Sequence, residues 1–407
     1  MKVLVIGGGA AGMMAAVSAA KNGAEVALLE KNEKLGKKIY ITGKGRCNLL
    51  NRCDIEEFLQ NVNANKKFLM SALYAFSPDD AYSFFSDAGL ELKTERGNRV
   101  FPVSDKASDV TKTFEKLLKK YKVNVLLNTK VNGLVLENGK ITRVQTQSGD
   151  FCADRFIVCT GGVSYPSTGS TGDGLSFAKA VGHNIIEPKG GLIGLLADTP
   201  SELAGLTLKN VNAKILDGEK VLHEEFGEML FTHKGVSGPI ILTLSSKIAR
   251  CDFSKLFLSI DLKPALDEKQ LDLRLQRDFA EFSNKQFSNS LDNLLPRSLV
   301  SVILNKSEIA NNTKVHQITS QQRKNLVKLL KNLKFKLLGT EDIHTAIITC
   351  GGVDTKQISP AAMKSKLVDN LFFAGEVLDV DAFTGGFNLQ IAFSTGYLAG
   401  VGSTQEK

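Results

Sequence analysis

Three glycines near the N-terminus have the spacing of a dinucleotide-binding turn. Gly7, Gly9 and Gly12 form G-x-G-x-x-G directly after the apolar run 3–6, and the proline-free, Ala- and Met-rich stretch 10–21 predicts a helix. In this motif the first glycine permits a tight turn, the second lets a pyrophosphate approach the backbone, and the third lets helix and strand pack closely. The N–H groups and the dipole at the start of the helix then attract the phosphates.

Glu30 stands where such a motif places its ribose contact. It follows a second apolar stretch, 26–29, about 20 residues after the glycines, and its carboxylate can accept hydrogen bonds from both ribose hydroxyls. A strand, a glycine turn, a helix and an acidic residue in this order are far more specific than a glycine motif alone. The sequence therefore favours a dinucleotide site, and the alternative is a purely structural glycine turn.

A glycine- and lysine-rich loop, 31–51, follows Glu30. Its glycines are expected to break any helix and to let the backbone approach a cofactor. Four cations in the loop would balance phosphate charge: Lys37, Lys38, Lys44 and Arg46. The alternative is a solvated basic loop. Cys47 is either a reactive thiol activated by Arg46 or a small side chain that fills a tight loop, and we prefer the second interpretation.

The composition is that of a globular protein without a membrane span. At 407 residues the chain is expected to form two or three units, and it has no stretch of about 20 apolar residues. The six cysteines form no C-x-x-C pair and the five histidines stand at no ligand spacing. This pattern argues against a metal site and for reduced thiols in a cytoplasmic protein.

The net charge of +8 is interpreted as a surplus spread along the chain. No aromatic–basic interleaving or recognition motif accompanies it, and attraction for cofactor phosphates explains the basic cluster in 34–46. We therefore expect a small-molecule substrate and neither a membrane nor a nucleic acid as partner. The sequence leaves the oligomeric state open.

The pattern of elements changes in the middle of the chain. From about residue 188, short apolar runs between turn residues predict strands without helices, which is typical of a small barrel or sandwich. Residues 267–333 are instead rich in Leu, Lys and Gln and predict helices. The segment 231–242 is either a substrate-contacting loop or a turn into the apolar stretch 240–244.

A second glycine turn lies near the C-terminus. The predicted strand 371–374 runs into Gly375 and Glu376, and Gly386 and Asn388 then open a helix of small residues. This arrangement again offers a helix N-terminus to an anion and a carboxylate to hydroxyl groups. The alternative, a well-capped C-terminal helix, explains Gly386 and Asn388 but not the preceding Gly-Glu.

Four sequence blocks together give the chain a resemblance to two-dinucleotide-binding-domain flavoproteins. They are GGGAAGMMAA with Glu30, LGKKIYITGKGRCN, GVSYPSTGSTGDG and AGEVLDVDAFTGGFNLQ. More narrowly, the chain resembles the bacterial family that includes aminoacetone oxidase and the bile-acid (3-dehydro-bile acid) ene-reductase. The family's cofactor is FAD. Its fold is a flavin domain made from both chain ends, with a β-barrel and a small helical domain inserted.

The resemblance also implies which residues contact FAD. The pyrophosphate would lie on residues 7–12, the ribose on Glu30 and the adenine against Val131. The full implied set is Gly7, Gly9, Ala10, Ala11, Gly12, Glu30, Lys31, Lys37, Lys38, Gly45, Arg46, Cys47, Asn48, Val131, Thr160, Gly161, Gly375, Glu376, Asp381, Gly386, Phe387 and Asn388. Lys44 departs from the G-G-G-R-C-N pattern that we expect here, and its charge would tune the flavin potential or select an anionic substrate.

These observations predict an α/β fold with a Rossmann-like FAD-binding domain built from both chain ends, an inserted β-barrel domain and a small helical subdomain. We expect the FAD-binding domain in residues 1–188 and 345–407. The barrel, as the substrate domain, is expected in 189–265 and 333–344, and the helical subdomain in 266–332.

The expected function is that of an FAD-dependent oxidoreductase that transfers hydride between flavin N5 and a small organic substrate. By resemblance, NAD(P)H-dependent reduction of an activated C=C bond in a steroid- or bile-acid-like enone comes first. A flavin oxidase of a small amine such as aminoacetone comes second, and a non-catalytic FAD-binding redox or RNA-associated module third. Without a second G-x-G-x-x-G, the electron partner is either transiently bound NAD(P)H or dioxygen. Lys44 or Arg46 would stabilise an anionic reduced flavin, and no residue is named as a general acid or base.

Overall fold

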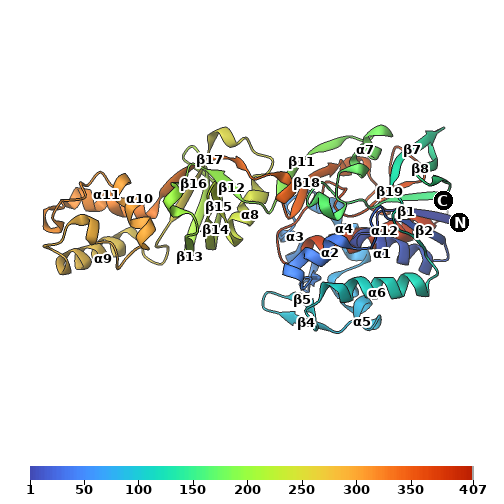
Figure 1. Cartoon of the computed structure of the whole chain (residues 1–407), viewed down its shortest axis with the longest axis horizontal. Helices are drawn as coiled ribbons and strands as arrows, with labels where there is room; N and C mark the ends of the chain where they lie inside the picture. The colour runs from blue at the N-terminus through green and yellow to red at the C-terminus, as the bar shows by residue number, and fades with distance from the viewer. Residues whose placement is uncertain (406–407) are drawn as a thin grey trace. The chain divides into compact units, whose positions relative to one another are not determined.

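The computed structural model describes residues 1–405, which divide into two compact units (Figure 1). Unit 1 comprises Met1–Gly191 and Ile343–Lys407, so both ends of the chain contribute to it, and unit 2 comprises Leu192–Asp342. Glu406 and Lys407, which end the predicted segment 345–407, lie outside the described residues. Within residues 1–405, the helices are all too short or too polar to cross a membrane.

A parallel five-stranded sheet forms the centre of unit 1. Its order is β19-β10-β1-β2-β6, and each neighbouring pair is parallel. The strands are β1 (Lys2–Ile6), β2 (Glu25–Leu29), β6 (Asn124–Leu126), β10 (Arg155–Val158) and β19 (Leu371–Phe373). Gly7, Thr160 and Gly375 follow the three adjacent strands β1, β10 and β19, so the predicted glycine turns meet at one edge of the sheet. Ligands bind at this carboxyl edge in open α/β sheets.

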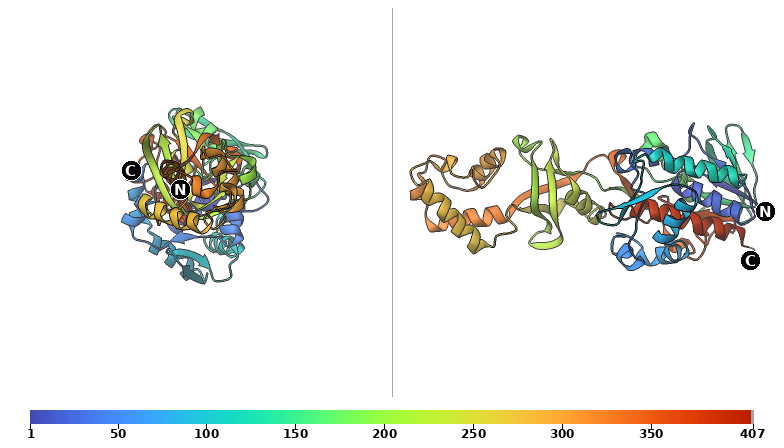
Figure 2. Two further views of the ribbon diagram at one scale, coloured as in Figure 1. Left: turned by 90° about the vertical axis from the view of Figure 1, so that its left-hand side faces the viewer. Right: turned by 90° about the horizontal axis from the view of Figure 1, so that it is seen from below.

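Two helices from opposite ends of the chain pack against each other in unit 1. α1 (Ala10–Lys21) and α12 (Phe387–Thr404) run side by side, as the blue and red helices of Figure 2 show. A Cβ at Gly396 would lie 2.4 Å from the carbonyl oxygen of Ala11, and one at Gly400 would lie 2.5 Å from that of Ala15. Small residues therefore allow this close approach, and the two helices run in the same direction.

Smaller elements complete unit 1. Its helices are α2 (Lys37–Ile41), α3 (Ile55–Gln60), α4 (Lys66–Ala75), α5 (Pro78–Asp87), α6 (Ala107–Lys120) and α7 (Asp173–Ala180). Its antiparallel strands are β3 (Leu50–Asn51), β4 (Leu92–Glu95), β5 (Arg99–Pro102), β7 (Val131–Glu137), β8 (Lys140–Thr146), β9 (Gly149–Phe151), β11 (Ile185–Gly191) and β18 (Ile348–Val353). The expectation that glycines break any helix in 31–51 is wrong. Gly36 is left-handed, with φ of 65°, and starts α2, whereas Gly43 and Gly45 lie beyond its end.

Unit 2 contains a closed six-stranded barrel in the order β12-β15-β14-β13-β16-β17. The strands are β12 (Leu195–Ala197), β13 (Thr207–Asp217), β14 (Lys220–Phe231), β15 (Gly235–Ser237), β16 (Leu256–Asp261) and β17 (Leu333–Thr340). The apolar stretch 240–244 lies in α8 (Pro239–Lys247), which packs on β14. The parallel sheet and the barrel confirm the predicted α/β class.

Three further helices of unit 2 lie between the barrel strands β16 and β17 in the sequence: α9 (Glu268–Glu281), α10 (Arg297–Lys306) and α11 (Ser320–Lys331). Their buried side chains and those of the barrel form one apolar core. α11 begins at a capping box in which Thr319 accepts a hydrogen bond from the Gln322 N–H, which is a start signal legible in the sequence. Its apolar residues Leu326, Val327 and Leu330 are buried, so the other side of the helix faces solvent.

Candidate dinucleotide site

The three glycines of the N-terminal motif each have a different environment. Gly7 has φ of 102°, and a Cβ there would lie 2.6 Å from the Cys159 carbonyl oxygen. At Gly12 a Cβ would lie 1.8 Å from the Gly7 carbonyl oxygen, so any side chain would separate α1 from β1. At Gly9 a Cβ would meet nothing within 4 Å. Protein atoms thus occupy the space next to Gly7 and Gly12, whereas the space next to Gly9 is open.

The N-terminus of α1 has the features of an anion site. Gly9 is its N-cap and offers no side chain to the first turn, which also contains no acidic residue. The first bond of the helix runs from the Met13 N–H to the Gly9 carbonyl, at 2.9 Å. The N–H groups of Ala10, Ala11 and Gly12 precede this bond, as the first N–H groups of every helix do. An open cradle beside these donors fits the pyrophosphate of a dinucleotide.

Glu30 holds the adjacent backbone in place. Its carboxylate accepts hydrogen bonds from the Gly8 N–H at 2.7 Å and from the Asn32 N–H and side-chain amide at 2.8 and 2.7 Å. A carboxylate has about four acceptor positions, so these three donors leave room for a further donor such as a hydroxyl. The Glu30 carbonyl oxygen accepts from the Thr129 N–H at 2.9 Å, which brings Val131 and the start of β7 near this residue.

Lys38 and Glu376 form a fixed ion pair at the carboxyl edge of the sheet. The Lys38 ammonium lies 2.7 Å from a Glu376 carboxylate oxygen and donates to the Ser164 hydroxyl at 2.6 Å. The Thr349 N–H donates to Glu376 at 2.7 Å. Two residues that the sequence did not single out, Ser164 and Thr349, thus orient two that it did. Their place follows from the fold and not from a local pattern.

Two of the other predicted cations, Lys31 and Lys37, have their charge balanced by carboxylates. Lys31 donates to Asp173 at 2.7 Å, and Lys37 pairs with Glu33 at 3.2 Å. Lys44 is exposed. It is left-handed, with φ of 57°, which is the physical reason to expect a small residue at that position.

The Arg46 guanidinium lies 4.2 Å from the centre of the Phe101 ring and pairs with two carboxylates. Arg46 donates to Asp105 at 2.8 Å and also bonds Glu95. Hydrogen bonds from Arg46 hold the pKa of Glu95 below its ordinary value, and those from Lys93 and then Arg46 do the same for Asp105. Arg46 is therefore a compensated charge.

Cys47 is a filler and not a reactive thiol. Its side chain is fully buried, and desolvation raises the pKa of the thiol to about 12. Arg46 does not counter this shift, because its charge is held by Glu95 and Asp105. Burial also raises the pKa of the thiol of Cys159, below Gly7. Together with Gly45, at φ of 86°, Cys47 shapes the loop that leads to Asn48.

Residues from the C-terminal turn meet the N-terminal half of unit 1 at two places. A Cβ at Gly375 would lie 2.7 Å from that of Ala11, and one at Gly386 would lie 2.4 Å from the backbone of Leu50. Asn48, in the orientation that satisfies its amide, accepts from the Gly386 N–H at 3.1 Å. The Gly36 N–H also donates to the Gly8 carbonyl oxygen at 2.9 Å, so the loop 31–51 contacts both the turn before α1 and the start of α12.

Two further predicted residues, Asn388 and Asp381, form hydrogen bonds within the protein. Asn388 accepts from the Ala382 N–H at 2.9 Å, and Asp381 accepts from the Asn63 amide at 2.8 Å. Thr160 has a buried hydroxyl oxygen without a hydrogen-bond partner among the described residues, and Gly161 is left-handed with φ of 74°. Phe387 packs edge-on against Phe58, with 5.1 Å between ring centres.

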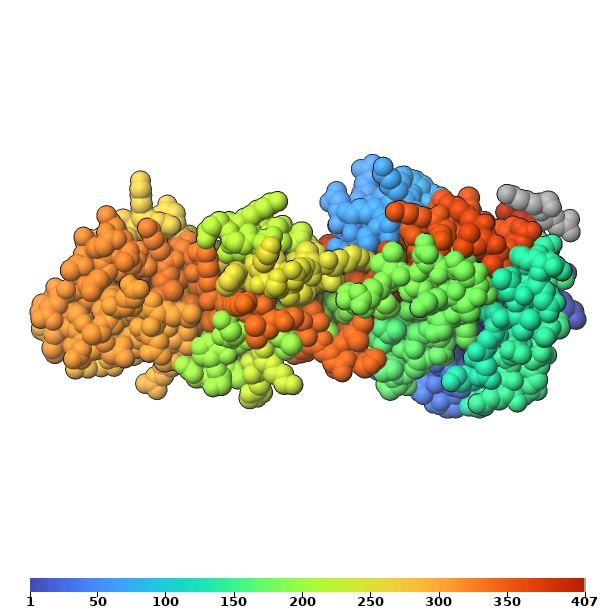
Figure 3. Space-filling model, turned by 90° about the horizontal axis from the view of Figure 1, so that it is seen from above, coloured from blue at the N-terminus to red at the C-terminus, as the bar shows by residue number. Residues whose placement is uncertain are grey.

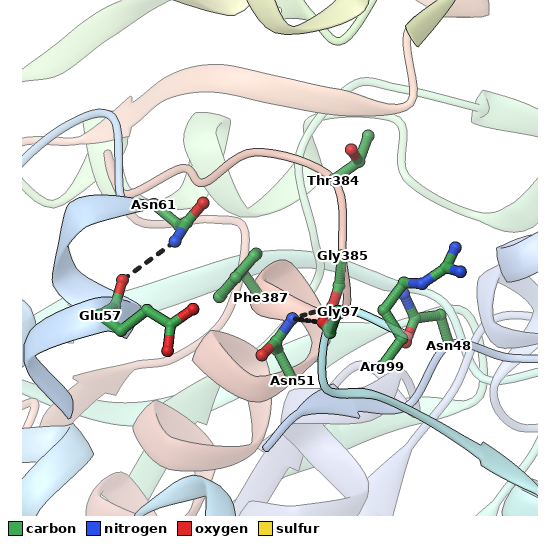
Figure 4. A pocket seen from close by; sticks show the side chains of 9 residues that line it. All are labelled: Asn48, Asn51, Glu57, Asn61, Gly97, Arg99, Thr384, Gly385 and Phe387. Atoms are coloured by element: carbon green, nitrogen blue, oxygen red, sulfur yellow. Dashed lines mark hydrogen bonds between the residues drawn. The ribbon is translucent and has the colours of Figure 1, made fainter. Parts of the chain in front are cut away.

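A cavity of about 370 Å³ opens beside the start of α12 (Figure 4). It is lined by Asn48, Asn51, Glu57, Asn61, Gly97, Arg99, Thr384, Gly385 and Phe387. Asn51 donates to the carbonyl oxygens of Gly97 at 3.0 Å and Gly385 at 3.1 Å, which joins the β4–β5 turn to the α12 turn. The lining is polar, with Phe387 as its one apolar side chain. Of these residues, the sequence singled out only Asn48 and Phe387 as cofactor ligands.

Residues 1–402 match the family described as HI0933-like protein Rossmann domain. The chain belongs to this family. Over 405 residues it is 31% identical to the 3-dehydro-bile acid delta(4,6)-reductase of Clostridium scindens, covering 98% of each chain. Over 401 residues it is 30% identical to the ribosomal RNA dihydrouridine synthase of Haemophilus influenzae, covering 97% of this chain and 96% of that one.

The fold is also similar to that of a solved structure. The 3-ketosteroid-delta4-(5alpha)-dehydrogenase from Rhodococcus jostii RHA1 is 15% identical and has a TM-score of 0.51, covering 99% of this chain and 96% of that one. The predicted resemblance is thus confirmed, as is the class of this HI0933-like protein, an FAD-dependent oxidoreductase. Its electron donor and its substrate remain predictions.

Proposed function

We propose that this HI0933-like protein uses FAD and NAD(P)H to reduce a C=C bond conjugated to a carbonyl group. The names of two relatives support this reaction: one is a delta(4,6)-reductase of a 3-dehydro-bile acid, and the other makes dihydrouridine in ribosomal RNA. A double bond near a 3-keto group and the C5=C6 bond of uracil are both conjugated to a carbonyl. Both relatives therefore reduce a C=C bond that is conjugated to a carbonyl group, and we propose the same reaction for this chain.

FAD would be held largely by backbone groups of unit 1. We assign its pyrophosphate to residues 7–12 and its ribose to Glu30, because the cradle at Gly9 is open and the start of α1 has no side-chain cap. The Lys38–Glu376 pair and the turn before α12 would orient the rest of the cofactor. When bound, FAD supplies hydride-transfer chemistry. The chain binds it, orients it and shapes the space for a substrate.

The polar lining of the cavity is the observation that carries the substrate assignment. Both amide hydrogens of Asn51 are bonded to the carbonyl oxygens of Gly97 and Gly385. Asn61 and Arg99 present an amide and a guanidinium group, and an asparagine amide both donates and accepts hydrogen bonds. A uracil ring needs this combination, since its edge has a donor N–H between two acceptor oxygens. A fused hydrocarbon ring system needs a predominantly apolar pocket instead. We therefore propose a uracil ring, as found in uridine of RNA, as the substrate.

The reaction balances with NAD(P)H as the named reductant. Saturating the C5=C6 bond adds one hydride and one proton to the ring. NAD(P)H gives up the hydride equivalent and becomes NAD(P)⁺, while water supplies the proton. The RNA substrate reverses the expectation that nucleic acid is not a partner, and the name of the 30% identical relative supports the reversal.

A 3-keto-4-ene of a fused ring system is the second candidate substrate. The 31% identity to a bile-acid reductase over nearly the whole chain favours it. This substrate was the first expectation from the sequence, and the polar cavity argues against it. Oxidation of an amine such as aminoacetone stays a prediction that the same assay addresses.

An anaerobic assay of the FAD-loaded protein tests the proposal. NADPH or NADH is added first, and bleaching of the flavin absorption identifies the donor. Reoxidation is then followed with a uridine-containing RNA, free uridine, a 3-keto-4-ene steroid, or air plus aminoacetone. We expect bleaching and a mass gain of two hydrogens in uridine. A flavin that neither nicotinamide reduces, or that only the steroid or air reoxidises, would contradict the proposal.

A further inference from the structure

The positive charge of the chain is concentrated in one part of unit 2. Residues 293–340 contain nine lysines and arginines and a single acidic residue, Glu308. This segment alone accounts for the net charge of +8, and the rest of the chain is balanced. The expectation that the surplus is spread along the chain is therefore wrong. The segment contains α10, α11 and β17.

Three of these nine cations are held by carboxylates within unit 2. Arg323 lies 2.7 Å from Asp272, and Lys331 lies 2.6 Å from Asp261. Lys334 approaches Glu219 at 3.6 Å. The other six are exposed and form no ion pair with any residue in 1–405: Arg297, Lys306, Lys314, Lys324, Lys328 and Lys336. Two-thirds of the segment's positive charge is thus available to a partner.

α11 carries the most regular part of this surface. Lys324 and Lys328 are four residues apart, so they lie on one side of the helix, and Gln321 and Asn325 share that side. The Gln321 amide donates to Asn325 at 3.0 Å. Figure 3 shows a face of unit 2 that is formed largely by the orange atoms of this segment, and Figure 1 shows α10 beside α11.

The chemistry of the surface favours a nucleic acid over a membrane. Among residues 293–340, all of which are described, Leu338 is the one large apolar side chain that is exposed, so the surface has little to insert into lipid. Lysines interspersed with glutamine and asparagine are suited to phosphates and sugar hydroxyls. α9, by contrast, carries acidic residues that pair with its own or neighbouring cations, as Asp278 does with Arg274.

We propose that the exposed cations of residues 293–340, centred on Lys324 and Lys328 of α11, form a docking surface for the phosphate backbone of RNA. We call this set the α11 basic surface. The inference rests on the proposed function, because an enzyme that acts on uridine in RNA needs contacts outside a cavity of about 370 Å³. Such contacts supply affinity and not sequence selectivity.

A salt titration of RNA binding tests the proposal. The FAD-loaded full chain is mixed with a fluorescently labelled RNA hairpin whose loop contains uridines, and the dissociation constant is measured over a range of salt concentrations. We expect Lys324→Glu/Lys328→Glu to weaken binding by about tenfold or more and to lower the salt slope by about 1.5. Lys324→Gln/Lys328→Gln should give a smaller loss in the same direction.

The control variant reverses the charge of two lysines on a helix of unit 1. Lys116 and Lys120 of α6 are also exposed and four residues apart, so Lys116→Glu/Lys120→Glu changes the net charge equally. The proposal requires this control to bind RNA nearly as tightly as the parent protein. FAD content and the thermal midpoint, measured for every variant, separate a lost contact from a lost fold.

Each outcome has a defined meaning. Equal RNA affinity of the parent and both α11 variants would overturn the proposal, as would a parent that binds phosphatidylglycerol-containing vesicles but no RNA. A parent that reduces free uridine without binding the hairpin would refute the docking surface and leave the proposed function standing. A parent that binds the hairpin through Lys324 and Lys328 but reduces no uridine would refute the proposed function alone.

Discussion

Two regions of this protein are suited to bind phosphate groups, and they differ in the kind of donor they present. At the start of α1 the donors are backbone N–H groups, and nearby cations such as Lys31, Lys37 and Arg46 are paired with carboxylates. On the α11 basic surface the donors are exposed lysines without ion pairs among residues 1–405. A cofactor of fixed shape is matched by fixed dipoles, whereas a long polyanion is matched by mobile charge.

We expect the largest effect from a substitution at Gly12, which packs α1 against β1. Gly12→Ala places a Cβ 1.8 Å from the Gly7 carbonyl oxygen, so α1 must move away from β1. Overpacking of this kind should lower the free energy of unfolding by about 3 kcal/mol and abolish FAD retention. Chemical denaturation of the apoprotein measures the first effect. The ratio of flavin absorbance to protein absorbance after desalting measures the second. An unchanged midpoint would show that the turn is looser than described.

A substitution at Gly9 should separate FAD binding from folding. Gly9→Ala adds a Cβ that meets no protein atom within 4 Å, so the free energy of unfolding of the apoprotein should stay within about 1 kcal/mol. The methyl group would enter the space assigned to the pyrophosphate and weaken FAD binding by about tenfold or more. Titration of FAD into apoprotein measures this. Parent-like affinity would place the pyrophosphate elsewhere.

Arg99 tests whether the cavity next to α12 receives the substrate. Arg99→Gln removes a charged donor from the cavity lining and should lower kcat/KM for uridine reduction by about tenfold, without a change in FAD affinity. Arg96 is exposed on the same hairpin and does not line the cavity, so Arg96→Gln is the matched control. Equal kcat/KM values for both variants would show that the substrate does not bind in this cavity.

Cysteine reactivity gives the smallest effect, since no change in activity is expected. At pH 8 a thiol with a pKa of about 12 is ionised in roughly one molecule in ten thousand, so Cys47 should resist iodoacetamide in the folded protein. The exposed Cys152 and Cys251 should react first, and all cysteines should react in guanidinium. Mass spectrometry of the digested protein identifies which cysteines have been modified. Rapid labelling of Cys47 with release of FAD would contradict its role as a filler.

Local patterns predicted the elements of the dinucleotide site well. Gly7, Gly9 and Gly12 have distinct tasks that follow from backbone sterics, and α1 begins and ends where the stretch 10–21 predicts. The expected strand-turn-helix at Gly375 is also present. These features depend on neighbours in sequence, which is why spacing and residue type suffice to find them.

Contacts between distant segments could not be predicted in this way. The cavity combines Asn51 and Asn61 with Arg99 and Gly385, which no local motif connects. The partners of Arg46 lie 49 and 59 residues away, so its pairing was invisible in the loop that contains it. The charge of residues 293–340 was legible by counting, but it gained meaning only when the ion pairs of Arg323 and Lys331 were known.

The most direct test of the account compares two variants in two assays. FAD affinity and RNA affinity are measured for Gly9→Ala and for Lys324→Glu/Lys328→Glu in the full chain. We expect Gly9→Ala to lose FAD affinity but keep RNA binding, and the α11 variant to lose RNA binding but keep FAD. If either variant loses both, or if the α11 variant binds RNA like the parent protein, the division of the two phosphate-binding tasks between these regions is wrong.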